Sequence, residues 1–190
     1  MWDGLTVFWL RGGHVNAKDA RYVNNEAASR SGEQIDFSFG KNWLAYVSGL
    51  EERHIAEAQR SFVESTGLTS LVGYSFLDAG CGSGLSSLVA SLLNAEKVVS
   101  FDIDPSSVAC TEQLRSRFAR DAGRREVQTH SLLDRDLPLK ITPADVVCCW
   151  GVAHHTGSMW EAIDHVAGCV AENGMLLLAI YNRTNIPAHG

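Results

Sequence analysis

Short apolar runs alternate with helical patterns along residues 74–181 of the chain. The runs lack a regular polar side, and several are rich in β-branched and aromatic residues, as expected of strands buried on both faces. We predict five strands on this basis: Tyr74–Ala79, Lys97–Phe101, Glu126–His130, Asp145–Trp150 and Met175–Tyr181. Because helices separate these strands, the pattern predicts an α/β fold with a doubly wound, mainly parallel sheet and helices on both of its faces.

Helix signals lie between the predicted strands. A helix starts over Leu85–Leu93, and Asp104 as N-cap with Pro105 behind it opens another that is expected to reach Gly123. The spacing of Ser158 and Glu161 is that of a capping box, for a helix that ends before Gly174. Between the third and fourth strands we expect a short helix or none.

The N-terminal part lacks the alternation of apolar runs and helical patterns seen from residue 74 onward, and the chain is therefore divided into three segments. Glu51–Thr66 is an amphipathic helix with Ile55, Ala58 and Phe62 on one side and Gly67 as its stop. We therefore predict a helical segment at 37–70 before an α/β core at 71–190. Residues 1–36 show little periodicity and are expected to form a loose extension.

Composition narrows the classes of protein that need to be considered. The 190 residues carry a net charge of −6, which argues against binding nucleic acid mainly through phosphate contacts. No apolar run approaches the ~20 residues of a membrane span. The five cysteines lie in apolar or glycine-rich segments without a C-x-x-C pair, and the neighbours Cys148 and Cys149 would face opposite sides of a strand. We expect reduced, buried thiols in a cytoplasmic protein, and no metal site.

The segment Phe76–Gly84, FLDAGCGSG, is the strongest candidate for a binding site. It places a glycine-rich turn between a strand and a helix, where a backbone can approach a ligand closely and a helix N-terminus presents unpaired N–H groups. Asp102 follows about 20 residues later at the end of the next strand, where a carboxylate can bind two ribose hydroxyls. Leu85 stands where a dinucleotide fingerprint has its third glycine, and no phosphate-loop Gly-Lys-Ser/Thr is present.

Several motifs in order resemble the class I S-adenosylmethionine-dependent methyltransferases. They are FLDAGCGSG at 76–84, VVSFDIDP at 98–105, DVVCCWGVAHHTG at 145–157 and NGMLLLAIYN at 173–182, and the similarity covers about residues 37–182. More narrowly, FSFGKNW at 37–43 with WGVAHHTG and AIYN resembles a bacterial subgroup of small, single-domain methyltransferases. The resemblance implies S-adenosyl-L-methionine as cofactor and S-adenosyl-L-homocysteine as product.

The resemblance also assigns cofactor-binding roles. The turn around the methionine portion of the cofactor is formed by Asp78, Gly80, Gly82 and Gly84. Asp102 holds the ribose hydroxyls, and the residues placed against the adenine are Ile103, Ser131 and Leu132. Trp150 and Gly151 lie beside the methionine portion and the reacting sulfonium. An N-terminal lid over the cofactor includes Phe39, Lys41, Asn42 and Trp43. The purely structural alternative is that Asp78 caps the turn, Asp102 caps the next helix and Trp150 belongs to the core.

The neighbours His154 and His155 are the candidate catalytic bases, because they follow the fourth strand at the edge where open α/β sheets bind ligands. Imidazole has a suitable pKa for removing a proton from a methyl acceptor. The alternative is that both rings only bind loop backbone.

Trp150-Gly151-Val152-Ala153 replaces the Asn/Asp-Pro-Pro-Tyr motif of enzymes that methylate nucleobase amino groups. This replacement disfavours an enzyme that methylates amino groups of nucleic acid. We expect a small organic acceptor, and the alternatives are a nucleotide-dependent oxidoreductase and an enzyme that methylates RNA or protein.

Six arginines cluster around the predicted 105–123 helix, and we interpret them as a solvated helix end. They are Arg115, Arg117, Arg120, Arg124, Arg125 and Arg135.

The resemblance also implies a seven-stranded sheet in which an antiparallel strand lies beside the fifth strand. Residues 182–190 are too few to supply the sixth and seventh strands. We expect these strands to be missing and the apolar edge to be covered by a second copy in a homodimer. The alternative to an active enzyme is a truncated or non-catalytic module that binds S-adenosylmethionine.

Overall fold

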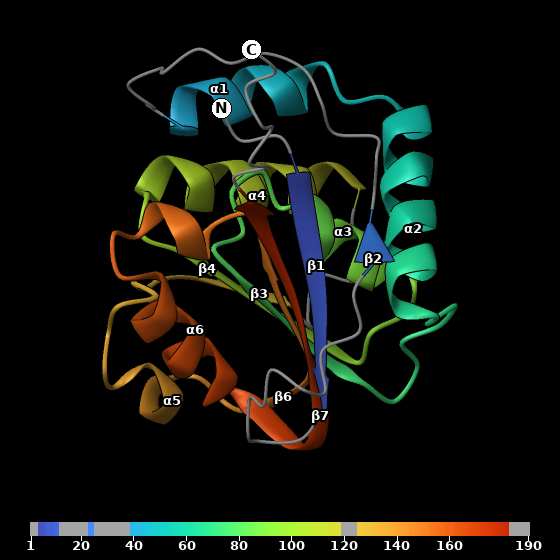
Figure 1. The fold of residues 1–190 in the computed structure, drawn as a ribbon. Coiled ribbons are helices and arrows are strands. Elements are labelled where there is room, and N and C mark those ends of the chain that lie inside the picture. The colour runs from blue at the N-terminus through green and yellow to red at the C-terminus, as the bar shows by residue number, and fades with distance from the viewer. Residues whose placement is uncertain (1–3, 12–22, 25–38, 119–124, 183–190) are drawn as a thin grey trace, which may run out of the picture.

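The computed structural model describes residues 4–11, 23–24, 39–118 and 125–182, and within them seven strands form one sheet in the order β2-β1-β7-β6-β3-β4-β5 (Figure 1). The strands β3 to β7 run parallel, as predicted. Their bounds are β3 Ser75–Ala79, β4 Lys97–Asp102, β5 Arg125–Thr129, β6 Ala144–Trp150 and β7 Val170–Asn182. The predicted Rossmann-like fold class is confirmed.

The edge of β7 is covered by the N-terminal part of the same chain. β1 (Gly4–Arg11) pairs antiparallel with β7 from Gly4 opposite Asn182 to Arg11 opposite Met175, and β2 (Val23–Asn24) pairs with β1. The expectation of a bare edge covered by a homodimer is therefore wrong. The sequence pattern assigned no strand to residues 1–36, because the partner that stabilises β1 lies at the other end of the chain. β1 takes the place beside the fifth parallel strand that the family gives to an antiparallel strand.

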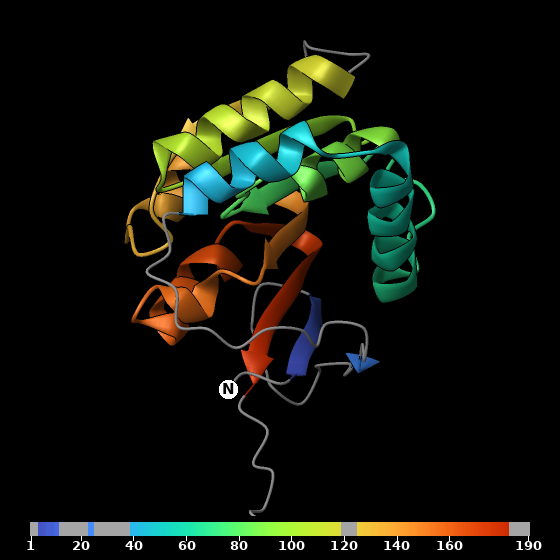
Figure 2. The ribbon, with the colours of Figure 1, turned by 90° about the horizontal axis from the view of Figure 1, so that it is seen from above.

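Helices cover both faces of the parallel strands (Figures 1 and 2). On one face lie α3 (Leu85–Leu92) and α4 (Pro105–Phe118), with the N-terminal helices α1 (Phe39–Ser48) and α2 (Glu52–Thr66) packed against them. On the other face lie α5 (Leu137–Lys140) and α6 (Met159–Ala167). Within the described ranges, no helix combines the length and the apolar character that a membrane span requires.

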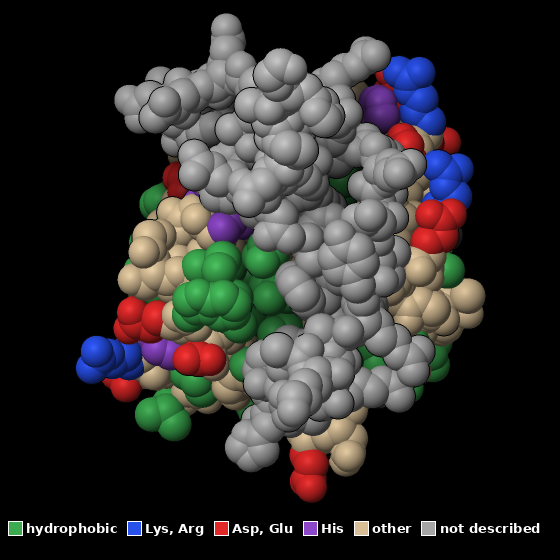
Figure 3. Space-filling view, in the orientation of Figure 1, with side chains coloured by type: hydrophobic (Ala, Val, Ile, Leu, Met, Phe, Trp, Pro, Cys, Tyr) green, Lys and Arg blue, Asp and Glu red, His purple; other side chains and the backbone are tan. Residues whose placement is uncertain are grey.

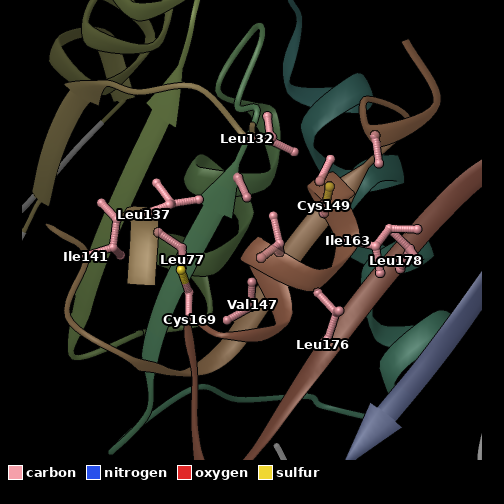
Figure 4. Packing of buried hydrophobic residues seen from close by; sticks show 14 of the residues in the cluster. Leu77, Leu132, Leu137, Ile141, Val147, Cys149, Ile163, Cys169, Leu176 and Leu178 are labelled. Atoms are coloured by element: carbon pink, nitrogen blue, oxygen red, sulfur yellow. The ribbon is translucent and has the colours of Figure 1, made fainter. Parts of the chain in front are cut away.

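The continuous apolar runs divide their side chains between two cores. Along β6, Val147 and Cys149 pack with α5 and α6 (Figure 4). Val146 and Cys148 pack with α2 and α3. This alternation follows from the two-residue period of a strand. All five cysteines are free and buried, as the sequence indicated.

The ends of two helices bear on the sequence expectations. The predicted continuation of α4 from Phe118 to Gly123 lies outside the described residues. At the start of α4 the N–H of Ser106 donates to the Asp104 carboxylate at 2.9 Å, which confirms Asp104 as a cap. At α6 the side chain of Ser158 makes no cap hydrogen bond, so the predicted capping box is absent. β7 begins at Val170, ahead of the predicted start at Met175. Val170 pairs with Ala144 and Met175 pairs with Val146, so the register between β6 and β7 shifts between these two pairs.

Candidate functional site

A cavity of about 310 Å³ lies where β3 and β6 end, beside the glycine-rich turn. β3 is the strand at which the sheet order changes direction, with β4 on one side and β6 on the other. Open α/β sheets bind ligands outside the carboxyl ends of their strands at this switch point. The cavity is lined by Trp43, Tyr46, Ala58, Ser61, Phe62, Asp78, Gly80, Cys81, Gly82, Ser83, Leu85, Ser86, Val89, Cys148 and Trp150.

The glycines of the turn are required by neighbouring side chains as well as by backbone conformation. Gly80 has φ +76°, and a Cβ there would lie 2.6 Å from Cγ1 of Val152. Gly84 has φ +80°, and a Cβ there would lie 2.8 Å from Cγ2 of Thr111 on α4. The turn is anchored to β4 because the N–H groups of Gly80 and Cys81 both donate to the carbonyl of Phe101 at 2.9 Å. Protein packing therefore explains glycines that the sequence assigned to the approach of a ligand.

Trp43 connects α1 to the turn. Its indole Nε1 lies 3.2 Å from where a Cβ on Gly82 would be, and its ring meets that of Tyr46 edge-on at 5.8 Å between centroids. Both aromatic side chains line the cavity. α1 thus forms a wall of the cavity, in the segment expected to act as a lid. The side chains of Phe39, Lys41 and Asn42 lie outside the described residues.

Asp78 places a buried carboxyl group in the cavity wall. Its Oδ2 accepts hydrogen bonds from the N–H of Ser87 at 3.0 Å and from the Ser87 hydroxyl at 2.6 Å. The Ser87 hydroxyl also lies 2.7 Å from that of Ser100 on β4. Burial raises the pKa of Asp78 to about 6, with a further contribution from the charge of Asp102, while the hydrogen bonds from Ser87 act in the opposite direction. Above pH 6 the cavity wall carries a negative charge suited to a cationic group of a ligand.

Asp102 lies beside the turn but does not line the cavity. Its Oδ2 accepts from the N–H of Gly82 at 3.0 Å, and its Oδ1 accepts from the N–H of Asp104 at 2.9 Å. These bonds give Asp102 a structural role in holding the turn against β4. Its neighbour Ile103 is 64% exposed.

Ser131 and Leu132 follow β5, on the far side of β4 from the cavity. The Ser131 hydroxyl accepts from the N–H of Leu133 at 3.1 Å, and Leu132 is buried, with its carbonyl 2.9 Å from Nδ1 of His165. With Asp102 and Ile103 they lie at the carboxyl ends of the neighbouring strands β4 and β5. The expected ribose and adenine residues thus share one edge of the sheet, adjacent to the cavity rather than in its lining.

Trp150 lines the cavity at the end of β6, and the next residue turns the chain away from it. Gly151 has φ +71° and donates its N–H to the carbonyl of Ala179 at 2.9 Å. His154 and His155 follow in a short 3-10 helix, with their ring centroids 4.0 Å apart. Burial lowers the pKa of His154 to about 4 and also lowers that of His155. Neither ring belongs to the residues that line the cavity.

The sequence placed Trp43 at the cofactor but did not indicate the other cavity residues of the N-terminal helices. Tyr46 comes from α1, and Ala58, Ser61 and Phe62 come from α2. The apolar side of the amphipathic 51–66 helix was the available signal, but periodicity alone does not distinguish a side that covers a core from one that closes a pocket.

Residues 77–176, more than half of the chain, match the family model described as "Methyltransferase domain". The chain belongs to this methyltransferase family. The predicted resemblance to the class I S-adenosylmethionine-dependent methyltransferases is confirmed at this level, and S-adenosylmethionine is the family's cofactor. The narrower bacterial subgroup remains a prediction.

Curated relatives include the ribosomal protein L11 methyltransferases of Azotobacter vinelandii, 36% identical over 109 residues, and of Pseudomonas aeruginosa, 34% identical over 109 residues. Each match covers 57% of this chain and 34% of the relative, so this methyltransferase chain aligns with about a third of their length. Their names specify a protein substrate. The expectation of a small-molecule acceptor is contradicted by this finding.

Solved structures share the fold of this methyltransferase chain. A protein from Methanococcus maripaludis described as an S-adenosylmethionine-dependent methyltransferase aligns with a TM-score of 0.58 at 14% identity, over 77% of this chain and 65% of its own. An O-methyltransferase family protein from Burkholderia thailandensis aligns with a TM-score of 0.55 at 19% identity, over 73% and 39%. At these identities the likeness establishes the architecture only.

Proposed function

We propose that this chain transfers the methyl group of S-adenosylmethionine to a protein acceptor, with the cofactor held in the cavity beside the glycine-rich turn. The observation that carries the proposal is the position of that cavity, at the switch point of a methyltransferase-family sheet and against the turn. Its volume of about 310 Å³ is within the range of small-molecule sites, ~300–1,000 Å³.

The residues of the cavity fit the charges of this cofactor. S-adenosylmethionine carries a sulfonium and an ammonium group, and the ionised carboxylate of Asp78 supplies a matching negative charge. The rings of Trp43 and Trp150 offer faces to a cation. We assign the turn Asp78, Gly80, Gly82 and Gly84, with Trp150 and Gly151, to the methionine portion.

The remaining assignments extend the site along the sheet edge. Asp102, Ile103, Ser131 and Leu132 lie towards the ends of β4 and β5, which suits the ribose and adenine on the side of the turn away from β6. Asp102 already accepts two backbone hydrogen bonds, so each of its oxygens has one further lone pair for a ribose hydroxyl. In this arrangement the residues at the ends of β4 and β5 would hold the nucleoside, and the residues of the cavity would hold the methionine portion.

The chemistry supplied by the bound cofactor is an electrophilic methyl group, which passes to a nucleophile as the bond to sulfur breaks. The chain aligns the acceptor with this methyl group, excludes water with α1 and receives the proton that the acceptor loses. We retain His154 and His155 as candidates for that proton transfer. Of the two, His155 is the better candidate because it is exposed, whereas burial makes His154 a weak base.

Proton transfer by histidine is tested by alanine substitution at each position. If either histidine acts as the base, replacing it by alanine should lower turnover at least about tenfold. Unchanged turnover in both variants would remove histidine from the mechanism and leave solvent as the proton acceptor.

Calorimetric titration of the chain with S-adenosylhomocysteine tests the cofactor site, with NAD as the control ligand. We expect micromolar binding, no response to NAD, and loss of binding in Asp102→Ala. Asp136→Ala, which removes an exposed carboxylate away from the cavity, is the matched control. A folded chain that does not bind would contradict the assignment.

The acceptor is tested with S-adenosylmethionine that carries a labelled methyl group. The chain is incubated with purified ribosomal protein L11 and, separately, with a cell extract. We expect label in the acid-precipitated fraction, in ribosomal protein L11 or in another protein of the extract. Label confined to the small-molecule fraction would refute a protein acceptor.

A further inference from the structure

The C-terminal end of α1 is held by a cation from α4. Arg117 donates from Nη1 to the carbonyl of Val47 at 3.0 Å, and its guanidinium carbon lies 4.8 Å from the centre of the Phe118 ring. α1 ends at Ser48, so the Val47 carbonyl is one of the last four without an acceptor role inside the helix. It accepts from the N–H of Leu50 just beyond the helix at 3.2 Å, and Arg117 is its second donor. The last turn of α1 contains no basic residue of its own. Arg117 therefore supplies the positive charge that stabilises a helix C-terminus.

The same end of α1 positions the aromatic wall of the cavity. Val47 is buried against Leu114 of α4, and Trp43 packs on this cluster from one helical turn earlier. Because residues four apart share a helix face, fixing Val47 also fixes the direction of Trp43. Figure 2 shows α1 lying alongside α4.

α4 also holds the opposite wall. The hydroxyl of Thr111 lies 3.2 Å from Sγ of Cys81 and 3.3 Å from the carbonyl of Gly82, both in the turn. One helix thus carries contacts to the turn and to α1, and the cavity lies between these two elements. A shift of α1 away from α4 would widen the cavity at Trp43 and Tyr46.

We propose that Arg117 is a positioning residue that latches α1 against α4 and thereby sets the affinity of the cavity for its cofactor. The proposal rests on the proposed function for the identity of the ligand. Sequence analysis placed Arg117 in a solvated helix end, and this hydrogen bond gives it a specific partner 70 residues away. Of the other arginines in that group, Arg120 and Arg124 lie outside the described residues.

The latch itself is tested without any ligand, by hydrogen–deuterium exchange of the full chain. Arg117→Ala should speed exchange of the amides of residues 43–50 by roughly threefold or more, because the lost bond involved a charged donor. Amides of α2 should not change. Arg60→Ala is the matched control, since its exposed ion pairs with Glu57 and Glu64 lie within α2. Figure 3 shows basic and acidic side chains gathered on the outer side of the molecule over α2.

Titration with S-adenosylhomocysteine then links the latch to the cavity. We expect Arg117→Ala to weaken binding measurably, by at most the factor by which it speeds exchange of α1, because affinity follows the fraction of chains with α1 in place. Arg117→Lys should restore most of both, and Arg60→Ala should change neither. Unchanged exchange of α1 in Arg117→Ala would overturn the latch. Faster exchange with unchanged affinity would overturn its link to the cavity, as would an Arg117→Lys variant no better than alanine. If the wild-type chain binds no S-adenosylhomocysteine, the proposed function fails and the exchange result still decides the latch.

Discussion

Replacing Gly80 by alanine should destabilise the protein by more than the strain of its backbone conformation. A non-glycine residue in the left-handed region costs ~1–2 kcal/mol. Gly67, the C-cap of α2, has φ +70° and no atom within 4 Å of the position that a Cβ would occupy, so Gly67→Ala measures this strain alone. At Gly80 the added carbon would also lie 2.6 Å from Cγ1 and 2.8 Å from Cγ2 of Val152.

The overlap at Gly80 cannot be relieved by rotating a flexible side chain. Valine is branched at Cβ and stiff about χ1, and the Cβ of Val152 itself would lie 3.1 Å away. Forcing an additional carbon into such a site costs ~1–3 kcal/mol. The total for Gly80→Ala is therefore ~2–5 kcal/mol, against ~1–2 kcal/mol for Gly67→Ala.

The assay is urea unfolding of four variants: Gly67→Ala, Gly80→Ala, Val152→Ala and the Gly80→Ala/Val152→Ala double variant. Removing the two methyl groups of Val152 should relieve the overlap, which gives a favourable coupling of ~1–3 kcal/mol in the double-mutant cycle. Equal destabilisation by the two glycine substitutions, or a coupling near zero, would refute the packing argument for this glycine.

Three further predictions concern the cavity and the sheet edge. The raised pKa of Asp78 means that the unfolded chain releases this proton first, so the free energy of unfolding should fall by up to about 3 kcal/mol as pH rises from about 4 to about 6. Asp78→Asn should remove most of that slope in urea titrations across this range, and an identical slope would contradict the assignment. Trp43→Ala should weaken binding of S-adenosylhomocysteine by about tenfold through the lost aromatic wall, whereas Trp160→Ala, at an exposed site on α6, should leave calorimetric affinity unchanged. Deleting residues 1–11 should expose the backbone of β7 and lower the midpoint of thermal unfolding by at least about 5 °C, and an unchanged midpoint would show that β1 contributes no stability.

The parallel core was predictable because its signals are local. Runs such as Asp145–Trp150 are apolar at almost every position, and only a strand covered on both faces can bury them. The turn at 80–84 was equally clear, because glycines between a strand and a helix permit the positive φ angles that a tight turn requires. Element ends were less certain, and Ser158 shows why. Ser158 and Glu161 have the spacing of a capping box, yet the side chain of Ser158 makes no hydrogen bond to the start of α6.

The site was predictable only in part. The sequence indicated the residues that the chain order itself brings to the strand ends, such as Asp78 and Trp150, and both line the cavity. Motif order could not show that Asp102 holds the turn through Gly82, or that His154 and His155 are not among the residues that line the cavity. Side-chain direction at those positions depends on neighbours from other strands.

By itself, the sequence determined the alternation of strands and helices, the parallel core and the position of the glycine-rich turn, because periodicity and local backbone preference act over a few residues. Only the tertiary structure decided that β1 covers the edge of β7 and that Arg117 joins α4 to α1. Each of these contacts joins elements that are separated by other elements along the chain. Their energy comes from backbone pairing, burial and hydrogen bonding between surfaces that meet only once the core has formed.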